Sequence, residues 1–332
     1  MSQRDHGGDL GAAIAHYGGR PEDWVDLSTG INPNAYPLPE IDEEVWKRLP
    51  QQNRLAGLVD AARSAYSVKE GVAVVPAPGA QAIIQHCPAL AGSRGVCAVV
   101  SPTYNEHAAA FMGAGWEVQE VTRLSEAADA DVLVVVNPNN PDGQTWSVTM
   151  LVEASAGKRL VVVDESFADT LVGWRSIASL DLPNVIALRS FGKFYGLAGV
   201  RLGFALTNPA LAHALADRLG PWCVSGPALE IGESALTDHE WAAQTRAHLH
   251  GAAQRLDRMA TDAGLGLVGG TPLYRLYRTR DAASLQSHLA RAHIFTRIFS
   301  YDASWIRIGL PGEEPEWKRL EQAFSGIPNA AV

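Results

Sequence analysis

The stretch NVIALRSFGKFYGLAGVRLGFALT, residues 184–207, decides the fold of this chain. It holds two apolar runs separated by a glycine-rich turn, and the first run ends at Lys193. Apolar runs without polar alternation predict strands that are buried on both faces of a sheet. A lysine at the end of a buried strand loses hydration, which favours a neutral, nucleophilic amine. Taken alone, a buried lysine near Arg201 is more often half of a structural ion pair, so Lys193 gains meaning only from the rest of the chain.

Four further apolar runs precede this stretch, each bounded by Gly, Pro, Asn or Asp. They are VAVVPAPGA (72–80), GVCAVVSPTY (95–104), DVLVVVNPNN (131–140) and RLVVVDES (159–166). Helix-like segments separate them, so the pattern predicts an α/β protein with a mostly parallel central sheet covered by helices. In open sheets of this class, ligands bind at the carboxyl ends of the strands. Because these runs end in Tyr, Asn, Asp, Ser and Lys, the sequence predicts one shared site there.

After about residue 209 the pattern changes to that of a smaller α+β domain. Residues 209–263 and 281–292 read as helical, and short strands are expected at 269–279, 294–299 and 304–310. The first 40 residues read as extended and rich in loops. We therefore predict an N-terminal arm with part of the small domain (1–44), a large domain (45–208) and a C-terminal small domain (209–332).

The composition restricts the classes of protein that fit. Apolar residues make up 47% and charged residues 19%, and the formal net charge of −9 argues against nucleic acid as a partner. The three cysteines, Cys87, Cys97 and Cys223, form no CxxC pair, so neither a disulfide framework nor a zinc site is expected. The start of the chain lacks the apolar core of a signal peptide, and no apolar run has membrane-spanning length. A cytoplasmic protein without a membrane or metal partner is therefore expected.

The motifs at the strand ends are individually weak, but their order is specific. They run GAQ (79–81), SPTY (101–104), NPNNPDG (137–143), VVDES (162–166) and SFGK (190–193), with Arg201 eight residues after Lys193. In this order the chain resembles, along essentially its whole length, the fold-type I enzymes of the aspartate aminotransferase superfamily, which use pyridoxal 5′-phosphate (PLP). The resemblance implies a large domain that binds PLP, a small domain built from both chain ends, and a homodimer with sites at its interface.

The same resemblance implies a role for each candidate residue. Lys193 is implied as the lysine that forms a Schiff base with PLP, and Asp164 as the carboxylate that keeps the pyridine nitrogen protonated. Asn140 is implied as a donor to the phenolic oxygen of the ring, and Tyr104 as the aromatic side chain that stacks on it. Contacts to the cofactor phosphate are implied for Gly79, Ala80, Gln81, Ser190 and Arg201. Arg307, in WIRIGLPG, is implied to bind the α-carboxylate of the substrate.

Two branches of the superfamily resemble this chain: the L-threonine-O-3-phosphate decarboxylases of cobalamin biosynthesis and the histidinol-phosphate aminotransferases. Both ends of the chain, HGGDLGAAIAHYG with VDLSTGINPN and IFTRIFSYDASWIRIGLPG, favour the decarboxylases. So do Asp142, where aminotransferases usually have Thr, and Phe167, where many have Tyr. The decarboxylase branch implies further substrate contacts by His6, Asn32 and Arg297. The expected reaction converts L-threonine O-3-phosphate to (R)-1-amino-2-propanol phosphate.

Other interpretations stay open at this point. A histidinol-phosphate aminotransferase or a related aminotransferase would use the same PLP site, and nothing in the sequence fixes which substrate bond is cleaved. A regulator with this fold would carry a basic helix-turn-helix segment, and a dehydrogenase would carry GxGxxG after its first strand; the chain has neither. The Tyr with which many relatives reach the partner's PLP phosphate has no counterpart in LPQQNRLAGL (49–58).

Overall fold

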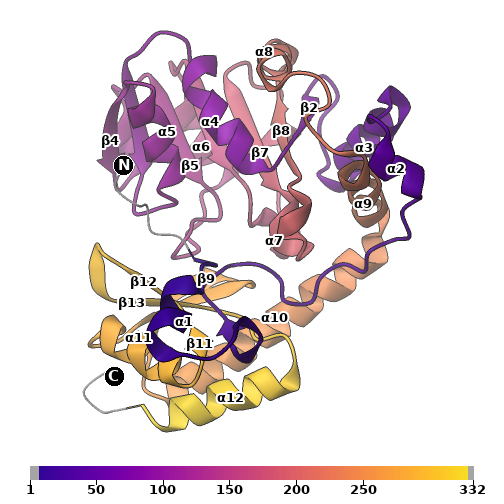
Figure 1. Cartoon of the computed structure of the whole chain (residues 1–332). Helices are drawn as coiled ribbons and strands as arrows, with labels where there is room; N and C mark the ends of the chain where they lie inside the picture. Colours follow the sequence, from indigo (N-terminus) through magenta and orange to yellow (C-terminus); the bar gives the residue numbers. More distant parts are fainter. Residues whose placement is uncertain (1–6, 328–332) are drawn as a thin grey trace. The chain divides into compact units, whose positions relative to one another are not determined.

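The computed structural model describes residues 7–327, which form two compact units. The large unit comprises residues 35–140 and 144–244. The small unit comprises the described residues up to 34, residues 141–143 and the described residues from 245 onward. Figure 1 follows the chain through its helices and strands. The functional domain boundaries expected after residues 44 and 208 stay a prediction.

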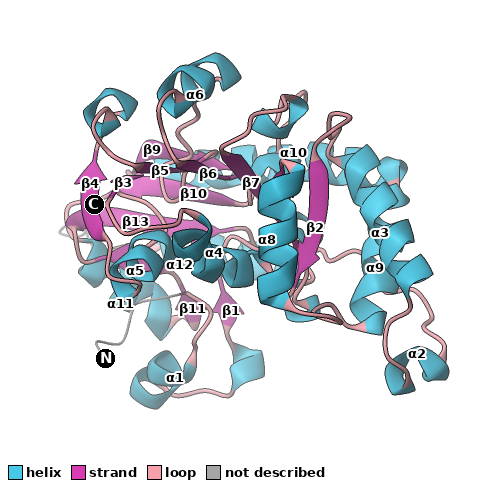
Figure 2. Cartoon of the chain, turned by 90° about the horizontal axis from the view of Figure 1, so that it is seen from above, coloured by secondary structure: helices cyan, strands magenta, loops and turns pink. Residues whose placement is uncertain are grey.

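The large unit is built around a seven-stranded sheet with the order β2-β8-β7-β6-β5-β3-β4 (Figure 2). Its strands are β2 (Ala73–Ala77), β3 (Val96–Val100), β4 (Glu117–Val121), β5 (Val132–Val136), β6 (Leu160–Asp164), β7 (Val185–Ser190) and β8 (Gly203–Thr207). The strands β4, β3, β5, β6 and β7 run parallel, whereas β8 pairs antiparallel with both β7 and β2. The predicted α/β class with a mostly parallel sheet is confirmed, and each of the six apolar runs contains one strand.

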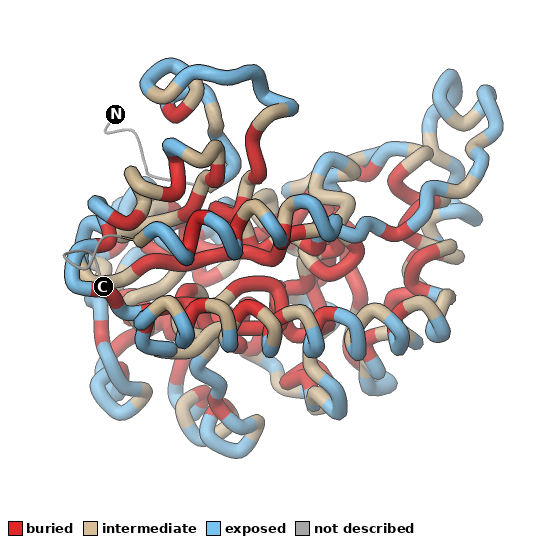
Figure 3. The backbone as a smooth tube through the Cα atoms, turned by 90° about the horizontal axis from the view of Figure 1, so that it is seen from below, coloured by how far each residue is buried: buried red, intermediate tan, exposed pale blue. Residues whose placement is uncertain are grey.

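Burial explains why these strands read as continuous apolar runs. Every position of β5 and β6 is buried. Figure 3 colours the backbone by burial and shows buried segments between exposed ones. The strand β4 is not among the predicted strands. Its sequence EVQEV is mostly exposed and lies at one edge of the sheet, where a strand has only one neighbour and needs few apolar side chains.

Helices of the large unit enclose its core. They are α2 (Glu43–Lys47), α3 (Gln52–Ala65), α4 (Ala80–Leu90), α5 (Glu106–Gly113), α6 (Val148–Ser155), α7 (Phe191–Phe194), α8 (Pro209–Leu219) and α9 (Gly226–Thr237), and α10 (His239–Asp262) continues into the small unit. Ile83 of α4, Phe111 of α5 and Leu215 of α8 pack in one cluster with side chains of the sheet. The strand members of this cluster recur at every second position, as in Val132 and Val134, so these helices cover one face of the sheet.

The small unit holds a four-stranded antiparallel sheet with the order β12-β13-β10-β9. Its strands are β9 (Gly266–Thr271), β10 (Tyr274–Arg278), β12 (Arg297–Phe299) and β13 (Asp302–Gly309). A separate short pair joins β1 (Val25–Asp26) in parallel to β11 (Ile294–Phe295). Its helices are α1 (Gly11–Tyr17), α11 (Ala282–Arg291) and α12 (Glu314–Ser325).

The strand predictions for this unit need two corrections. The single strand expected at 269–279 is a hairpin, because the chain turns between Thr271 and Tyr274. The strand expected at 294–299 is interrupted at Thr296 and pairs with two different partners. Within residues 7–327, no helix has the length and apolar character needed to cross a membrane. The three cysteines are free thiols.

Candidate active site

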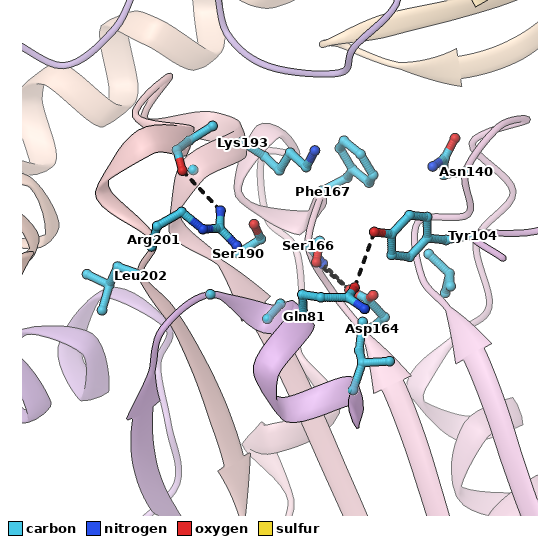
Figure 4. Close-up of a pocket in the computed structure, with 16 residues that line it drawn as sticks. Gln81, Tyr104, Asn140, Asp164, Ser166, Phe167, Ser190, Lys193, Arg201 and Leu202 are labelled. Atoms are coloured by element: carbon cyan, nitrogen blue, oxygen red, sulfur yellow. Dashed lines mark hydrogen bonds between the residues drawn. The ribbon is translucent and has the colours of Figure 1, made fainter. Parts of the chain in front are cut away.

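A pocket of about 170 Å³ opens at the carboxyl ends of the strands of the large unit (Figure 4). All nine residues predicted to contact the cofactor line it: Gly79, Ala80, Gln81, Tyr104, Asn140, Asp164, Ser190, Lys193 and Arg201. They come from five separate strand ends and from the turn after α7, so the shared site expected from the sheet topology is present as a cavity. The roles of the individual residues stay predictions.

The start of α4 faces Arg201 and forms a cradle for an anion. Gly79 caps the helix with φ +86°, and the first amides of α4 have no partners within the helix. A Cβ atom on Gly79 would lie 2.6 Å from Nη2 of Arg201, and the positive φ at this position favours glycine. Arg201 is itself left-handed, with φ +55°, and its Nη1 donates to the Ala198 carbonyl at 3.0 Å. Amides at a helix start, a guanidinium and the nearby Ser190 hydroxyl suit a phosphate group.

Asp164 ends β6 at the floor of the pocket and is 3% exposed. Its Oδ1 accepts hydrogen bonds from the Ser166 hydroxyl and from the Ser166 amide, the latter at 2.9 Å. Its Oδ2 lies 2.9 Å from Nε2 of His107. Burial alone would raise the pKa of Asp164, but the hydrogen bonds and charge of His107, together with Ser166, hold it below its ordinary value. The site therefore presents a buried carboxylate that stays ionised near neutral pH.

Lys193 lies on α7, one turn of helix that follows β7 directly. A Cβ atom on the preceding Gly192 would lie 2.7 Å from the Cα atom of Ala198, so only glycine lets the chain fold back this closely. The Nζ atom of Lys193 lies 5.8 Å from the centre of the Phe167 ring, within the range of a cation–π contact. Figure 4 shows this amine and Asn140 directed into the same cavity.

Sequence reasoning missed two side chains that hold Asp164. His107 is 1% exposed and lies on α5, three residues after Tyr104. Ser166 lines the pocket two residues after Asp164. A serine two residues after an aspartate is a common local hydrogen-bonding pattern that the motif VVDES contained. The contact of His107 joins residues 57 positions apart in the chain, and no local pattern indicates it.

Three of the four residues predicted to contact the substrate, Asn32, Arg297 and Arg307, lie in the small unit. Arg297 and Arg307 are direct cross-strand partners on β12 and β13. Burial lowers the pKa of Arg307 to about 10; Tyr274 opposes this shift and the positive charge of Arg297 adds to it. Asn32 is 2% exposed, and its Oδ1 accepts from the Asn34 amide at 3.0 Å. His6 lies outside the described residues. Like charges at directly opposite positions of a sheet repel, and a bound anion would relieve that repulsion.

This fold, with a lysine, a buried aspartate and an anion cradle at the carboxyl ends of the strands, defines a class of cofactor-dependent α/β enzymes. The family model of aminotransferase class I and II matches residues 36–324. The chain belongs to this family.

Three similar proteins illustrate the likeness. A threonine-phosphate decarboxylase of Sinorhizobium sp is 43% identical over 96% of this chain and 97% of its own length. A threonine-phosphate decarboxylase of Pseudomonas aeruginosa is 41% identical over 98% of this chain and 99% of its own length. Among solved structures, histidinol-phosphate aminotransferase from Sinorhizobium meliloti, in complex with pyridoxal-5′-phosphate, matches with a TM-score of 0.81 at 20% identity, over 98% of this chain and 97% of that one. The last likeness shows the fold alone.

Proposed function

We propose that this protein binds PLP in the pocket of the large unit and decarboxylates L-threonine O-3-phosphate to (R)-1-amino-2-propanol phosphate. The observation that carries the proposal is the meeting of Lys193, the buried carboxylate of Asp164 and the anion cradle of α4 in one pocket. The two threonine-phosphate decarboxylases match nearly the whole chain, which supports this reaction over transamination.

The donor set fits PLP on an observation independent of the family: the start of α4, Ser190 and Arg201 line one side of the same cavity as Lys193 and Asp164. When bound, PLP supplies a protonated pyridine ring that takes up the electron pair released at the substrate Cα. Asp164 would hold the proton on the ring nitrogen, and its lowered pKa keeps it able to do so. Asn140 would donate to the phenolic oxygen, and Tyr104 would stack on the ring. The phosphate group would be held by the cradle formed by Gly79, Ala80, Gln81, Ser190 and Arg201.

Lys193 has two tasks in this proposal. Its Nζ atom, which is directed into the cavity, would hold the cofactor. The same amine, or water, would supply a proton to the substrate Cα. The groups that anchor the substrate would decide which of its bonds is broken.

Those anchors are proposed to be cationic and polar groups of the small unit. Threonine phosphate carries a carboxylate and a phosphate, so it requires more than one cationic contact. Arg307 is proposed to bind the carboxylate in a bidentate manner, and Arg297, its cross-strand neighbour, adds a second positive charge. Asn32 and His6 are proposed to contact the substrate phosphate.

A product assay without any 2-oxo acid tests this function. Purified protein with PLP is incubated with L-threonine O-3-phosphate, and CO₂ and the amino-alcohol phosphate are measured. We expect one CO₂ released for each aminopropanol phosphate formed. The absence of CO₂, together with amino transfer from histidinol phosphate to 2-oxoglutarate, would overturn the decarboxylase and leave an aminotransferase.

We also propose that the chain acts in the cytoplasm as a homodimer, with residues 45–208 as the PLP-binding domain. The family resemblance supports the dimer, and all nine predicted cofactor contacts fall within 45–208. Sedimentation equilibrium of the PLP-loaded protein is expected to give twice the chain mass of 35.5 kDa. A single chain mass at micromolar concentration would contradict the dimer.

A further inference from the structure

Glu106 is a buried carboxylate next to the pocket that none of the roles above uses. It is the first residue of α5 and is 6% exposed. Its Oε2 accepts a hydrogen bond from Nε2 of Gln81 at 2.9 Å. The Oε1 atom of Gln81 in turn accepts from the Tyr104 hydroxyl at 3.2 Å (Figure 4). Two hydrogen bonds therefore connect a buried charge to the aromatic ring that bounds the pocket.

The chemistry of these groups fixes the direction of both hydrogen bonds. A carboxylate offers only acceptors, so it binds the NH₂ end of an amide and turns the amide oxygen away. Gln81 therefore presents its oxygen to Tyr104, and the hydroxyl of Tyr104 must donate. An amide facing a neutral partner at this position would be free to turn over, and the hydroxyl would lose its defined acceptor.

The first turn of α5 holds the Tyr104 ring from a second side as well. The ring edge meets His107 with centroids 6.1 Å apart and planes at 84°. His107 is also the side chain that binds Asp164. Two consecutive residues, Glu106 and His107, thus support the two groups predicted to meet the cofactor ring, one on its face and one on its nitrogen.

An acidic residue in the first turn of a helix also interacts favourably with the helix dipole, which is the ordinary reason to find one there. That interaction does not require burial, and desolvating a carboxylate is costly unless hydrogen bonds compensate for it. Glu106 is buried and bonded to Gln81, which lines the pocket. Its placement therefore exceeds what a stabilised helix start needs.

We propose that Glu106 is a positioning residue, which fixes the plane of the Tyr104 ring against the cofactor ring through Gln81. The inference rests on the proposed function, because the stacking needs PLP. A fixed ring offers its face without losing conformational freedom when the cofactor binds, and this lowers the cost of binding. Glu106 does not itself line the pocket, so it acts only through its neighbours.

The test compares PLP binding by the full chain and by Glu106→Gln, which keeps the shape of the side chain but can donate to Gln81. Apo-protein is titrated with PLP, and the visible absorbance and visible circular dichroism are followed. We expect about a five- to tenfold increase in Kd, the size of one lost hydrogen bond, and a weaker dichroic band because the ring is held less firmly. Thermal unfolding is recorded for each variant.

Tyr104→Phe supplies the decisive background, since it keeps the ring and removes the hydroxyl. If Glu106 acts through that hydroxyl, Glu106→Gln has no further effect on Kd when combined with Tyr104→Phe. The control is Glu117→Gln, because Glu117 accepts from Gln119 at the same distance, 2.9 Å, on the exposed strand β4. This control is expected to leave Kd and the dichroic band unchanged.

The outcomes separate this inference from the proposed function. A wild-type protein that binds no PLP would remove both. A wild-type protein that binds PLP, with an unchanged Kd in Glu106→Gln, would overturn the positioning role alone, as would an equal loss in the Tyr104→Phe background. If Glu106→Gln fails to fold, Glu106→Asp keeps the charge but shortens the side chain so that it no longer reaches Gln81, and it is expected to raise Kd to a similar extent.

Discussion

The ends of β6 and β7 carry two sets of polar side chains with different tasks. Asp164 and Ser190 line the pocket, whereas their sequence neighbours Glu165 and Arg189 pair with each other, Oε2 to Nη1, at 3.1 Å. Successive side chains of a strand point to opposite faces. Asp164 and Ser190 can therefore line the pocket while the adjacent Glu165 and Arg189 form an ion pair elsewhere. Asp164 is 3% exposed and Glu165 is 0% exposed. Burial alone therefore does not show which of these two carboxylates borders a ligand site.

What distinguishes the two acids is the set of groups around them. Glu165 accepts from the Ser176 hydroxyl at 2.6 Å and from the Ile177 amide at 3.0 Å, and Arg189 also reaches Asp169. All these partners belong to the buried interior of the large unit. Asp164 has partners on one side and the cavity on the other. A buried acid at a strand end is thus a candidate for catalysis when it borders space that a ligand fills.

The largest effect is expected from breaking the buried ion pair of Glu165 and Arg189, and it is a loss of folding stability. Arg189→Met removes the positive charge and leaves two carboxylates buried, so we expect the free energy of unfolding to fall by about 3–5 kcal/mol. Urea unfolding monitored by circular dichroism measures it. Arg159→Met is the matched control, because Arg159 pairs with Asp131 at 3.0 Å at a partly exposed site. Equal losses in the two variants would mean that the buried pair is no more important than a surface pair.

Asp164, which lines the pocket, is expected to affect activity more than stability. Asp164→Asn keeps the size of the side chain but cannot hold a proton on the cofactor nitrogen, so we expect kcat to fall by about a hundredfold or more. The free energy of unfolding is expected to fall by less than in Arg189→Met, because Asn keeps the shape of the side chain and can still accept the hydrogen bonds of Ser166. Steady-state kinetics and urea unfolding of the same preparation check both halves. A near-normal kcat together with a large loss of stability would show that Asp164 has a structural role and would contradict its role at the cofactor.

A smaller effect is expected from His107, and it depends on pH. Burial raises the pKa of Asp164 and the hydrogen bonds of His107 and Ser166 lower it, with a net shift below the ordinary value. A lowered pKa in the folded state contributes stability above the unfolded pKa, and this contribution is lost as pH falls through the folded pKa. His107→Phe removes one of these bonds, so the pKa of Asp164 rises and the acid limit of PLP binding moves to higher pH.

Titrations of PLP binding across the acidic range up to neutral pH would detect this shift. His213→Phe is the control, since His213 lies 3.4 Å from Asp217 in a surface pair of the same residue types. An unchanged acid limit in His107→Phe would show that Ser166 alone suffices to keep Asp164 ionised.

The sequence was most informative where burial imposes a pattern. Strands such as β5 and β6, covered on both faces, must be apolar throughout, and this made them visible. The edge strand β4 meets no such demand and was missed. The hairpin of β9 and β10 was read as one strand because GGTPLYRLYRT keeps its strand-like composition through the turn.

For the site, the same logic reached as far as the strand ends. Residues that follow parallel strands meet at one edge, so Lys193, Asp164, Asn140 and Tyr104 could be assigned to a common site from the sequence. Glu106 and His107 could not, because they act across the space between α5 and its neighbours, and their spacing from Gln81 and Asp164 follows no period. Their roles depend on packing distances that only the folded chain defines.

The identity of the lysine that binds PLP tests the central claim most directly. The PLP-loaded protein is reduced with borohydride, digested, and its peptides are weighed by mass spectrometry. Lys158 is the comparison, because it too is buried, but its Nζ atom donates to the carbonyls of Ala127, Ala128 and Ala130 at 2.6, 2.6 and 2.8 Å. We predict that the reduced cofactor is found on the peptide that contains Lys193 and that Lys193→Ala abolishes the label. A label on Lys158, or one that persists in Lys193→Ala, would contradict the account.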